Sequence, residues 1–195
     1  MYQVGLTGGI GSGKTLVCNV LEKLGVPVYY ADSAARRLMN SNADLINKIV
    51  GMFGNEAYKE ESINRLYLAE QVFGNPQKLS DLNSVVHPVV REDYNSWAIS
   101  QKDAPYVVEE AAILFESGAN RFMDEIVWVY APDTLRIKRV MERDGVDEKS
   151  VRRRMKYQMD DEERKGLADY IIHNDETEML LPQIITMHTK LLNSR

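Results

Sequence analysis

The chain has 195 residues, 44% of them hydrophobic, and a formal net charge of -5. This length and composition predict one compact α/β body with insertions, large enough to bury a core. The negative charge excludes a generally basic nucleic-acid binder, so an anionic ligand would have to meet a local cluster of Lys and Arg. The single cysteine, Cys18, permits no internal disulfide and is expected in the core.

The sequence contains no uninterrupted apolar run of 18 residues, and no charged leader precedes an apolar stretch. We therefore expect no membrane span and no export signal. With one cysteine, a reducing, cytoplasmic location is expected. No nucleic-acid or membrane partner is predicted. The oligomeric state stays open, and a monomer is compatible with the sequence.

The first predicted strand, Tyr2 to Leu6, leads into Gly8-Gly9-Ile10-Gly11-Ser12-Gly13-Lys14-Thr15, and a helix is predicted from Lys14 to Leu24. The loop has a glycine followed, after four residues, by Gly-Lys-Thr. Between a strand and a helix, this spacing is typical of a loop whose backbone N–H groups surround phosphate. Lys14 would reach the β- and γ-phosphates of ATP, and the Thr15 hydroxyl would bind Mg²⁺. The sequence thus predicts a nucleoside-triphosphate site.

Asp32 follows the second predicted strand, Val26 to Tyr30, at the edge where open α/β sheets bind ligands. A carboxylate there could orient or deprotonate an attacking hydroxyl group. The alternative is that Asp32 only caps a helix that begins at Ser33. The two roles are compatible, and we favour the functional one.

A helical block is predicted from Ser33 to about Lys102, with apolar residues at helical spacing and a break at His87-Pro88, among others. The block is too long for one crossover, so it is expected to be an insertion beside the sheet. Arg36 and Arg65 could meet an anionic acceptor, and either could equally be a surface residue. His87 is expected mainly to form a hydrogen bond at a helix boundary.

Three further strands are predicted at Tyr106 to Glu110, Glu125 to Ala131 and Tyr170 to His173, which brings the predicted parallel sheet to five strands flanked by helices. Glu109 and Glu110 end the third strand, where an acidic group would face Mg²⁺ through water. Because side chains alternate along a strand, only one of the two can face the site, and we favour Glu110.

Two helices are predicted between the fourth and fifth strands, from Asp133 to about Asp144 and from about Asp147 to Gln158. A last helix is expected to run to near the C-terminus, with Asp175 as its N-cap.

Basic residues cluster in this region, because residues 136–156 hold nine Lys or Arg against four Asp or Glu. Arg136, Arg139 and Arg143 are spaced three and four apart and share one helical face. Guanidinium groups on a mobile helical hairpin could close over a triphosphate and neutralise its charge. About half of the cluster, notably Lys149 and Arg152, is expected on an ordinary solvated helix surface.

Taken together, these residues resemble the dephospho-coenzyme A kinase family along the whole chain. Leu6 to Lys14 is similar to that family's phosphate loop almost letter for letter. The other matching motifs, in chain order, are Ala31-Asp32 with Arg36, Phe53-Gly54, Arg65 with Leu68, Val72-Phe73, His87-Pro88, Leu114-Phe115-Glu116 with Gly118, Arg154 with Gln158, and Ala168-Asp169 with Asn174.

The chain departs from the family pattern in a few places. Glu110 and Ala112 stand where the family often has Asp and Pro, Asn64 where Asp is usual, and Thr15-Leu16 where Ser-Thr is usual. Thr15 keeps the metal-binding hydroxyl group. Glu110 extends the reach of the carboxylate by one methylene group.

The resemblance implies a P-loop fold like that of the nucleoside monophosphate kinases, in three parts. These would be a nucleotide-binding core (residues 1–32, 103–135 and 166–195), a helical coenzyme A-binding domain (33–102) and a lid (136–165). The implied reaction transfers the γ-phosphoryl group of ATP, with Mg²⁺, to the ribose 3′-hydroxyl of dephospho-coenzyme A. The products would be coenzyme A and ADP, in the last step of coenzyme A biosynthesis.

The resemblance also implies roles for individual residues. The catalytic set would be Lys14, Asp32, Arg139 and Arg143, with Asp32 at the acceptor oxygen and the two arginines in or beside the lid. The nucleotide-binding set would be Gly9, Ile10, Gly11, Ser12, Gly13, Lys14, Thr15, Arg139, Arg143 and Asn174, the last near the adenine. The substrate-binding set would be Asp32, Arg36, Arg65, His87 and Glu110, and the metal would be bound by Thr15 and Glu110.

Three other classes of function would carry different sequence features. A GTPase should contain Asp-x-x-Gly and Asn/Thr-Lys-x-Asp motifs, and the sequence has neither. Another small-molecule or nucleoside monophosphate kinase would share the fold and the loop and would differ only in the helical block that binds the phosphoryl acceptor. A non-enzymatic ATP-dependent switch would need neither Asp32 beside an acceptor pocket nor an arginine-bearing lid.

Overall fold

The structure, a computed structural model, describes residues 1–193. It divides into two compact units, one formed by residues 1–30 together with the chain from Ala98 onward, and one formed by residues 31–97.

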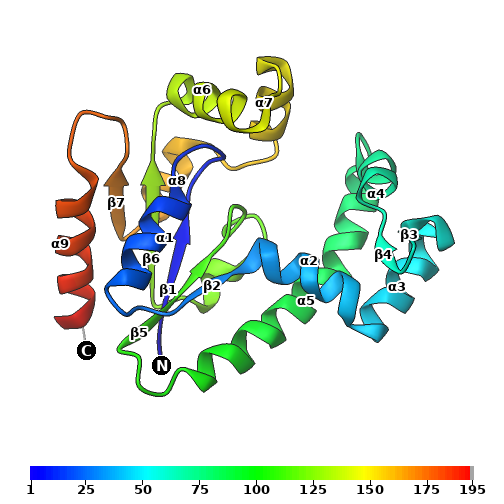
Figure 1. The fold of residues 1–195 in the computed structure, drawn as a ribbon, viewed down its shortest axis with the longest axis horizontal. Helices are drawn as coiled ribbons and strands as arrows, with labels where there is room; N and C mark the ends of the chain where they lie inside the picture. The colour runs from blue at the N-terminus through cyan, green and yellow to red at the C-terminus, as the bar shows by residue number, and fades with distance from the viewer. Residues whose placement is uncertain (194–195) are drawn as a thin grey trace. The chain divides into compact units, whose positions relative to one another are not determined.

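A five-stranded sheet forms the first unit, and all neighbouring strands in it are parallel (Figure 1). Its order is β2-β5-β1-β6-β7. The strands are β1 (Tyr2–Thr7), β2 (Val28–Tyr30), β5 (Tyr106–Glu110), β6 (Glu125–Tyr130) and β7 (Tyr170–His173). The predicted five-stranded parallel sheet is therefore confirmed.

Strand β2 begins later than predicted, at Val28 instead of Val26. The Val26 N–H donates to the carbonyl of Leu21, which completes the end of the preceding helix. Pro27 has no N–H to offer to a neighbouring strand, although its carbonyl accepts from Val108. The sheet ladder therefore starts only after the proline.

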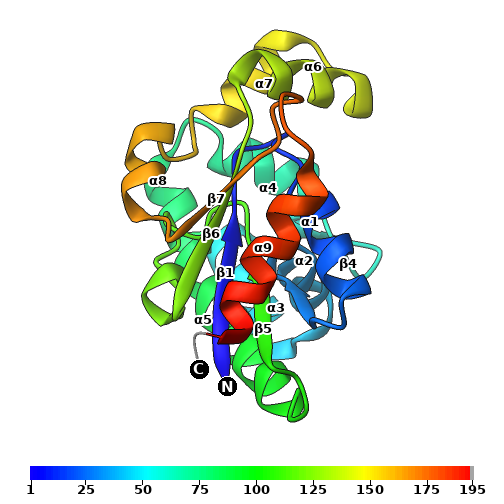
Figure 2. The same ribbon diagram turned by 90° about the vertical axis from the view of Figure 1, so that its left-hand side faces the viewer.

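The helices of this unit are α1 (Lys14–Lys23), α6 (Asp133–Asp144), α7 (Glu148–Met155), α8 (Asp161–Leu167) and α9 (Leu180–Asn193). Helices α1, α8 and α9 cover the faces of the sheet, whereas α6 and α7 lie beyond the carboxyl ends of the strands (Figure 1). Figure 2 shows α1 and α9 side by side on one face of the sheet, with α8 on the other side. Val17 and Leu21 of α1 and Ile184 of α9 pack with the strands in one core, and Cys18 is fully buried there, as predicted.

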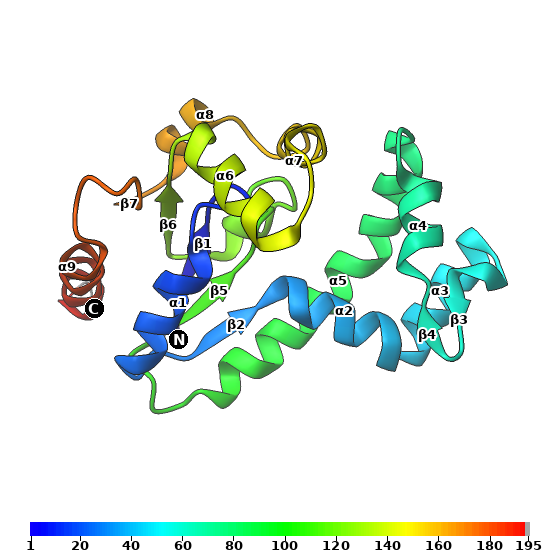
Figure 3. The same cartoon turned by 45° about the horizontal axis from the view of Figure 1, so that its top comes forward.

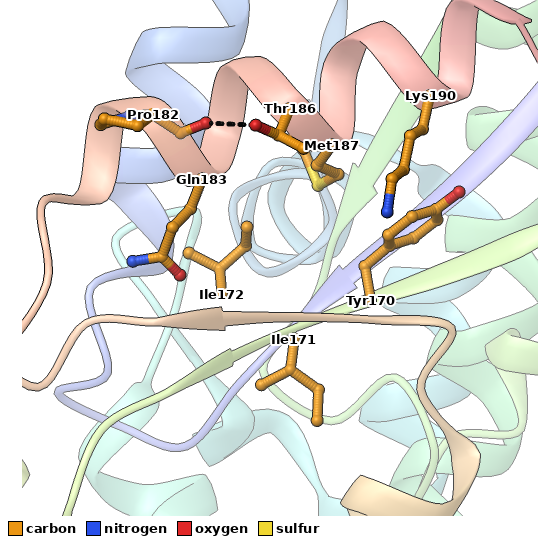
Figure 4. A pocket seen from close by; sticks show the side chains of 8 residues that line it. All are labelled: Tyr170, Ile171, Ile172, Pro182, Gln183, Thr186, Met187 and Lys190. Atoms are coloured by element: carbon orange, nitrogen blue, oxygen red, sulfur yellow. Dashed lines mark hydrogen bonds between the residues drawn. The ribbon is translucent and has the colours of Figure 1, made fainter.

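A shallow pocket of about 320 Å³ lies between α9 and the edge strand β7 (Figure 4). Tyr170 and Ile172 point toward the helix and Ile171 points away from it. The Lys190 ammonium group lies 6.0 Å from the centre of the Tyr170 ring. No residue of the glycine-rich loop lines this pocket, so it is separate from the predicted nucleotide site.

The C-terminal part differs from the sequence predictions in two ways. Helix α8, capped by the Asp160 side chain on the Glu162 N–H, was not predicted. Asp175 does not cap the last helix, because α9 begins only at Leu180. The Asp175 carboxylate instead accepts from the N–H and hydroxyl of Thr177, at 3.0 and 2.6 Å, and is used in a local turn.

The second unit is mainly helical. Its elements are α2 (Ala31–Ser41), α3 (Ala43–Phe53), a 3-10 turn (Asn55–Ala57), β3 (Tyr58–Lys59), β4 (Ser62–Ile63), α4 (Arg65–Val72) and most of α5 (Pro76–Ser100). The β3–β4 hairpin was not predicted. Its turn residues Glu60 and Glu61 both have positive φ, a conformation that usually calls for Asn or Gly, so the sequence carries no hairpin signal there.

The predicted break at His87-Pro88 is also wrong, because α5 runs through Pro88 without ending. Because Pro88 has no N–H, the carbonyl of Ser84 loses its helical hydrogen-bond donor. Both residues are exposed to water. Val86 and Val90 on either side are buried, so core packing holds the helix together across the proline. His87 therefore lies inside a helix and not at its boundary.

The packing of α9 leads to a stability prediction. Ile184 is fully buried, whereas the next residue, Ile185, is 45% exposed. Ile184→Ala should lower the free energy of unfolding by about 2–5 kcal/mol, because it leaves a cavity in the core. Ile185→Ala should change it by less than about 0.5 kcal/mol. Urea denaturation of both variants measures the difference, and equal losses would contradict this account of the core.

Candidate active site

The glycine-rich loop joins the end of β1 to the start of α1 and has the geometry of an anion site. Gly13 stands at the N-cap of α1 with φ 94°, and no side chain caps the helix. Gly11 has φ 79°, which is also in the left-handed region that favours glycine. The first N–H groups of α1 are therefore left for an anion, at the positive end of the helix dipole.

The elements around the loop leave no room for side chains on its glycines. A Cβ at Gly9 would overlap the guanidinium group of Arg136 on α6, and a Cβ at Gly13 would overlap the amide of Asn174 after β7. A Cβ at Gly11 would lie 2.5 Å from the Arg136 carbonyl oxygen. The glycines are thus required by close packing as well as by conformation.

The loop lies at the topological switch point of the sheet. β1 and β6 are neighbours, and the chain leaves them in different directions, into the loop after β1 and into α6 after β6. Ligands of open α/β sheets bind at this point, outside the carboxyl ends of the strands. Figure 3 shows α6 beside the loop, in agreement with the close approach of Arg136 to Gly9.

Lys14 and Glu110 meet beside the loop. The Lys14 ammonium group donates to the Gly8 carbonyl at 3.0 Å and lies 3.7 Å from a Glu110 carboxylate oxygen. Both side chains are only 11% exposed, which strengthens their attraction. Glu110 is thus the carboxylate that faces Lys14, whereas Glu109, its neighbour on the strand, points to the opposite face of the sheet.

The hydroxyl-bearing residues around the loop differ in their surroundings. Thr15 is exposed in the first turn of α1. The hydroxyl groups of Thr7 and Ser12 are buried and have no hydrogen-bond partner among residues 1–193. Burial, with a smaller contribution from Glu110, raises the pKa of the nearby Cys18 thiol, which therefore stays neutral and unreactive.

Two of the predicted arginines lie on α6 but make different contacts. Arg139 donates to the Asn174 carbonyl at 3.0 Å and to Glu176 at 3.2 Å, so it holds the segment after β7. The Arg143 side chain is 61% exposed and bonds to Asp144 at 2.7 Å. Hydrogen bonds from Arg143 and then from Arg154 lower the pKa of Asp144.

Asn174 is in direct contact with the loop. Its side-chain amide donates to the Ser12 carbonyl at 2.7 Å, and its backbone N–H donates to Tyr130 at the end of β6. Arg139, Asn174 and the loop therefore form one connected group. Arg152 instead pairs with Glu148 one turn earlier on its own helix, at 2.7 Å, as predicted for a surface residue.

The sequence did not assign roles to two side chains that also hold the loop. Arg136 is 6% exposed and pairs with Asp133 and, at 3.5 Å, with Asp161. Gln158 accepts a hydrogen bond from the Ile10 N–H at 2.8 Å. Arg136 was grouped with the lid arginines by spacing alone, and Gln158 was only part of a matching motif, because contacts between distant segments leave no local pattern.

Four of the five predicted substrate-binding residues lie in the second unit, whereas the fifth, Glu110, lies at the end of β5 in the first unit. Asp32 is the second residue of α2, exposed and without a hydrogen bond or ion pair to residues 1–193. Because α2 begins at Ala31, Asp32 is not its N-cap, and that alternative is wrong. Arg36 is exposed one turn later, on the same helical face as Asp32.

Arg65 and His87 lie on other helices of the second unit. Arg65 is exposed at the first position of α4. His87 is half-buried in α5, and burial lowers the pKa of its imidazole. No hydrogen bond or ion pair joins either side chain to Asp32 or Arg36 within the described chain.

Within residues 1–193, no helix is both long and apolar enough to cross a membrane.

Comparison with known proteins agrees with this geometry. Residues 2–179 match the family model for dephospho-CoA kinase. A dephospho-CoA kinase of Salinibacter ruber is 45% identical over 180 residues, which are 91% of this chain and 90% of that protein.

Two solved structures are similar over nearly the whole chain. A protein from Thermus thermophilus is 31% identical with a TM-score of 0.84, covering 100% of this chain and 98% of that one. A dephospho-CoA kinase from Campylobacter jejuni is 25% identical with a TM-score of 0.70, covering 98% and 97%. The P-loop kinase fold is thereby confirmed, and this chain belongs to the dephospho-CoA kinase family.

Proposed function

We propose that this protein transfers the γ-phosphoryl group of ATP to the ribose 3′-hydroxyl of dephospho-coenzyme A, giving coenzyme A and ADP. This reaction is the last step of coenzyme A biosynthesis. The observation that carries the proposal is a complete phosphate loop with Lys14 and Glu110 beside it, in a chain whose residues 2–179 match the dephospho-CoA kinase family.

The loop would bind the donor. The positive end of α1 and the loop N–H groups other than those of Ile10 and Ser12, which already donate to Gln158 and Gly9, supply partial positive charge without a side chain that must move. The Lys14 ammonium group, now on the Gly8 carbonyl, would turn to the β- and γ-phosphates. Catalysis of this kind relies on positioning and charge neutralisation, and covalent chemistry is not required.

A magnesium ion is expected with the triphosphate, and the residues present fit it. Mg²⁺ in kinase sites takes one or two protein oxygens and completes its shell with water and phosphate. Thr15 and Glu110 offer two such oxygens near Lys14, and residues 1–193 contain no group of three or more His, Cys, Asp or Glu side chains that could hold a metal ion by themselves. When bound, the ion would neutralise charge on the phosphates. We propose Thr15 directly and Glu110 through water as its protein contacts.

The helical unit would bind the acceptor. We propose that Asp32 takes the proton of the 3′-hydroxyl group, since it is exposed and has no competing partner. Arg36, on the same face of α2, would contact the acceptor's phosphates, and Arg65 and His87 are further proposed contacts of the coenzyme A moiety. In this reading residues 33–102 form the acceptor domain.

The segment 136–165 would act as the lid, and residues 1–32, 103–135 and 166–195 as the nucleotide-binding core. We propose that Arg139 and Arg143 neutralise charge on the transferring phosphoryl group. Arg143, which is largely exposed, would have to exchange Asp144 for phosphate when the donor binds. Asn174, already against the loop, would lie beside the adenine.

The first prediction from the proposed function concerns the phosphoryl acceptor. Purified protein with ATP and Mg²⁺ should phosphorylate dephospho-coenzyme A, and should not phosphorylate AMP, CMP, adenosine or shikimate. Lys14→Ala should lower this transfer by about 10²–10³-fold or more while the far-ultraviolet circular dichroism is unchanged. Lys23→Ala, an exposed lysine on the same helix, is the matched control and should have wild-type activity. Transfer to another acceptor alone would refute the proposed function.

The second prediction concerns Asp32. Asp32→Asn should lower kcat by about 10²–10⁴-fold, as for the loss of a positioned base, with KM for dephospho-coenzyme A changed far less. Asp44→Asn is the matched control, because Asp44 is also an exposed acidic residue in the first turn of a helix. Steady-state kinetics separates the two parameters. If only KM rises, Asp32 is a binding contact and not a base.

The third prediction concerns the lid arginines. Arg139→Gln and Arg143→Gln should each slow turnover by about tenfold or more, because each removes a positive charge that would stabilise the negatively charged transition state. Arg152→Gln, which removes only a helix-surface pair with Glu148, should leave kcat within twofold. A kcat at the wild-type value in all three variants would remove Arg139 and Arg143 from the catalytic set.

A further inference from the structure

Gln158 connects the end of the lid segment to the glycine-rich loop. It lies between α7 and α8, and its side-chain oxygen accepts the Ile10 N–H at 2.8 Å. Its side-chain nitrogen donates to the carbonyl of Ala112, just after β5, at 3.1 Å. One amide group therefore satisfies a backbone donor of the loop and a backbone acceptor beyond the strand that carries Glu110.

The turn that carries Gln158 is itself fixed. The N–H of the next residue, Met159, donates to the Glu116 carboxylate at 2.6 Å. Asp161, at the start of α8, lies 3.5 Å from the Arg136 guanidinium group and 3.0 Å from that of Arg164. Arg136 in turn fills the space above Gly9. These contacts connect α6, at the start of the lid segment, to α8, at its end, and hold Gln158 between them.

Ile10 joins the loop to the lid in a second way. Its side chain packs against Ile137 and Val140 of α6 and Val151 of α7. With its side chain held by apolar packing and its N–H held by Gln158, Ile10 has little freedom to move. Because Gly9 and Gly11 on either side lack side chains, the shape of this part of the loop depends on these contacts.

We propose that Gln158 is a positioning residue for the phosphoryl donor. It acts through Ile10, by holding the phosphate loop in the shape that binds ATP and by coupling that shape to the lid. This inference rests on the proposed function. It predicts that removing the amide weakens donor binding selectively and leaves the acceptor site unaffected.

The test compares two substitutions with a matched control. Gln158→Met keeps the length of the side chain and loses both hydrogen bonds, whereas Gln158→Glu keeps the acceptor for Ile10, loses the donor to Ala112 and adds a negative charge. Gln77→Met is the control, since the Gln77 amide is exposed and bonds only to Asp81 on its own helix, at 2.8 Å. All three are compared with the wild type by thermal unfolding.

Two readouts are expected to separate positioning from a structural role. Gln158→Met should raise the Kd for a non-hydrolysable ATP analogue, measured by calorimetry without acceptor, and KM for ATP by about tenfold, with KM for dephospho-coenzyme A within twofold. Gln158→Glu should lose at least as much donor affinity as Gln158→Met. The ratio of its Kd for the ATP analogue to the wild-type Kd should fall at higher ionic strength, because salt screens the repulsion between the added charge and the phosphates. Gln77→Met should match the wild type.

Unchanged donor affinity in Gln158→Met, or equal losses for both substrates, would overturn the inference. If Gln158→Met does not fold, Gln158→Glu carries the test by the same comparison of the two substrates. If neither variant folds, Gln158 is a determinant of the fold and the inference is wrong. A wild-type protein inactive on dephospho-coenzyme A would refute the proposed function, whereas the binding measurement, which needs no acceptor, tests Gln158 separately.

Discussion

The glycine-rich loop can bind an anion only because its glycines lack side chains. Its backbone adopts conformations that favour glycine, and it packs too closely against its neighbours to leave room for a Cβ atom. Gly11 and Gly13 have positive φ, and Gly9 and Gly13 lie against Arg136 and Asn174. The uncapped first turn of α1 then points its N–H groups out of the loop. Every further part of the nucleotide site is arranged around this short stretch of backbone.

The surrounding elements keep that backbone in shape. Arg136 approaches it from α6, Gln158 from the segment between α7 and α8, and Asn174 from the end of β7. Lys14 is held beside it by the buried Glu110 carboxylate. A site that is ordered before its ligand arrives loses less conformational entropy on binding, which favours both affinity and charge stabilisation.

The residues with proposed roles are divided between the two units of the chain. The sheet unit carries the phosphate loop and its partners, whereas Asp32, Arg36, Arg65 and His87 belong to the helical unit. In the proposed reaction the donor would use the first and the acceptor the second.

The sequence by itself determined the sheet and the loop, because strand periodicity and glycine spacing are local properties. It only favoured Glu110 over Glu109, and the tertiary structure places the Glu110 carboxylate beside Lys14. The sequence missed the Glu60-Glu61 hairpin and the continuous helix through Pro88, where an unusual turn and core packing override local preference. Only the tertiary structure brought Gln158 to Ile10 and Asn174 to Ser12, since these pairs are 148 and 162 residues apart. Contacts at that separation arise from the packing of the whole sheet, so no local pattern encodes them.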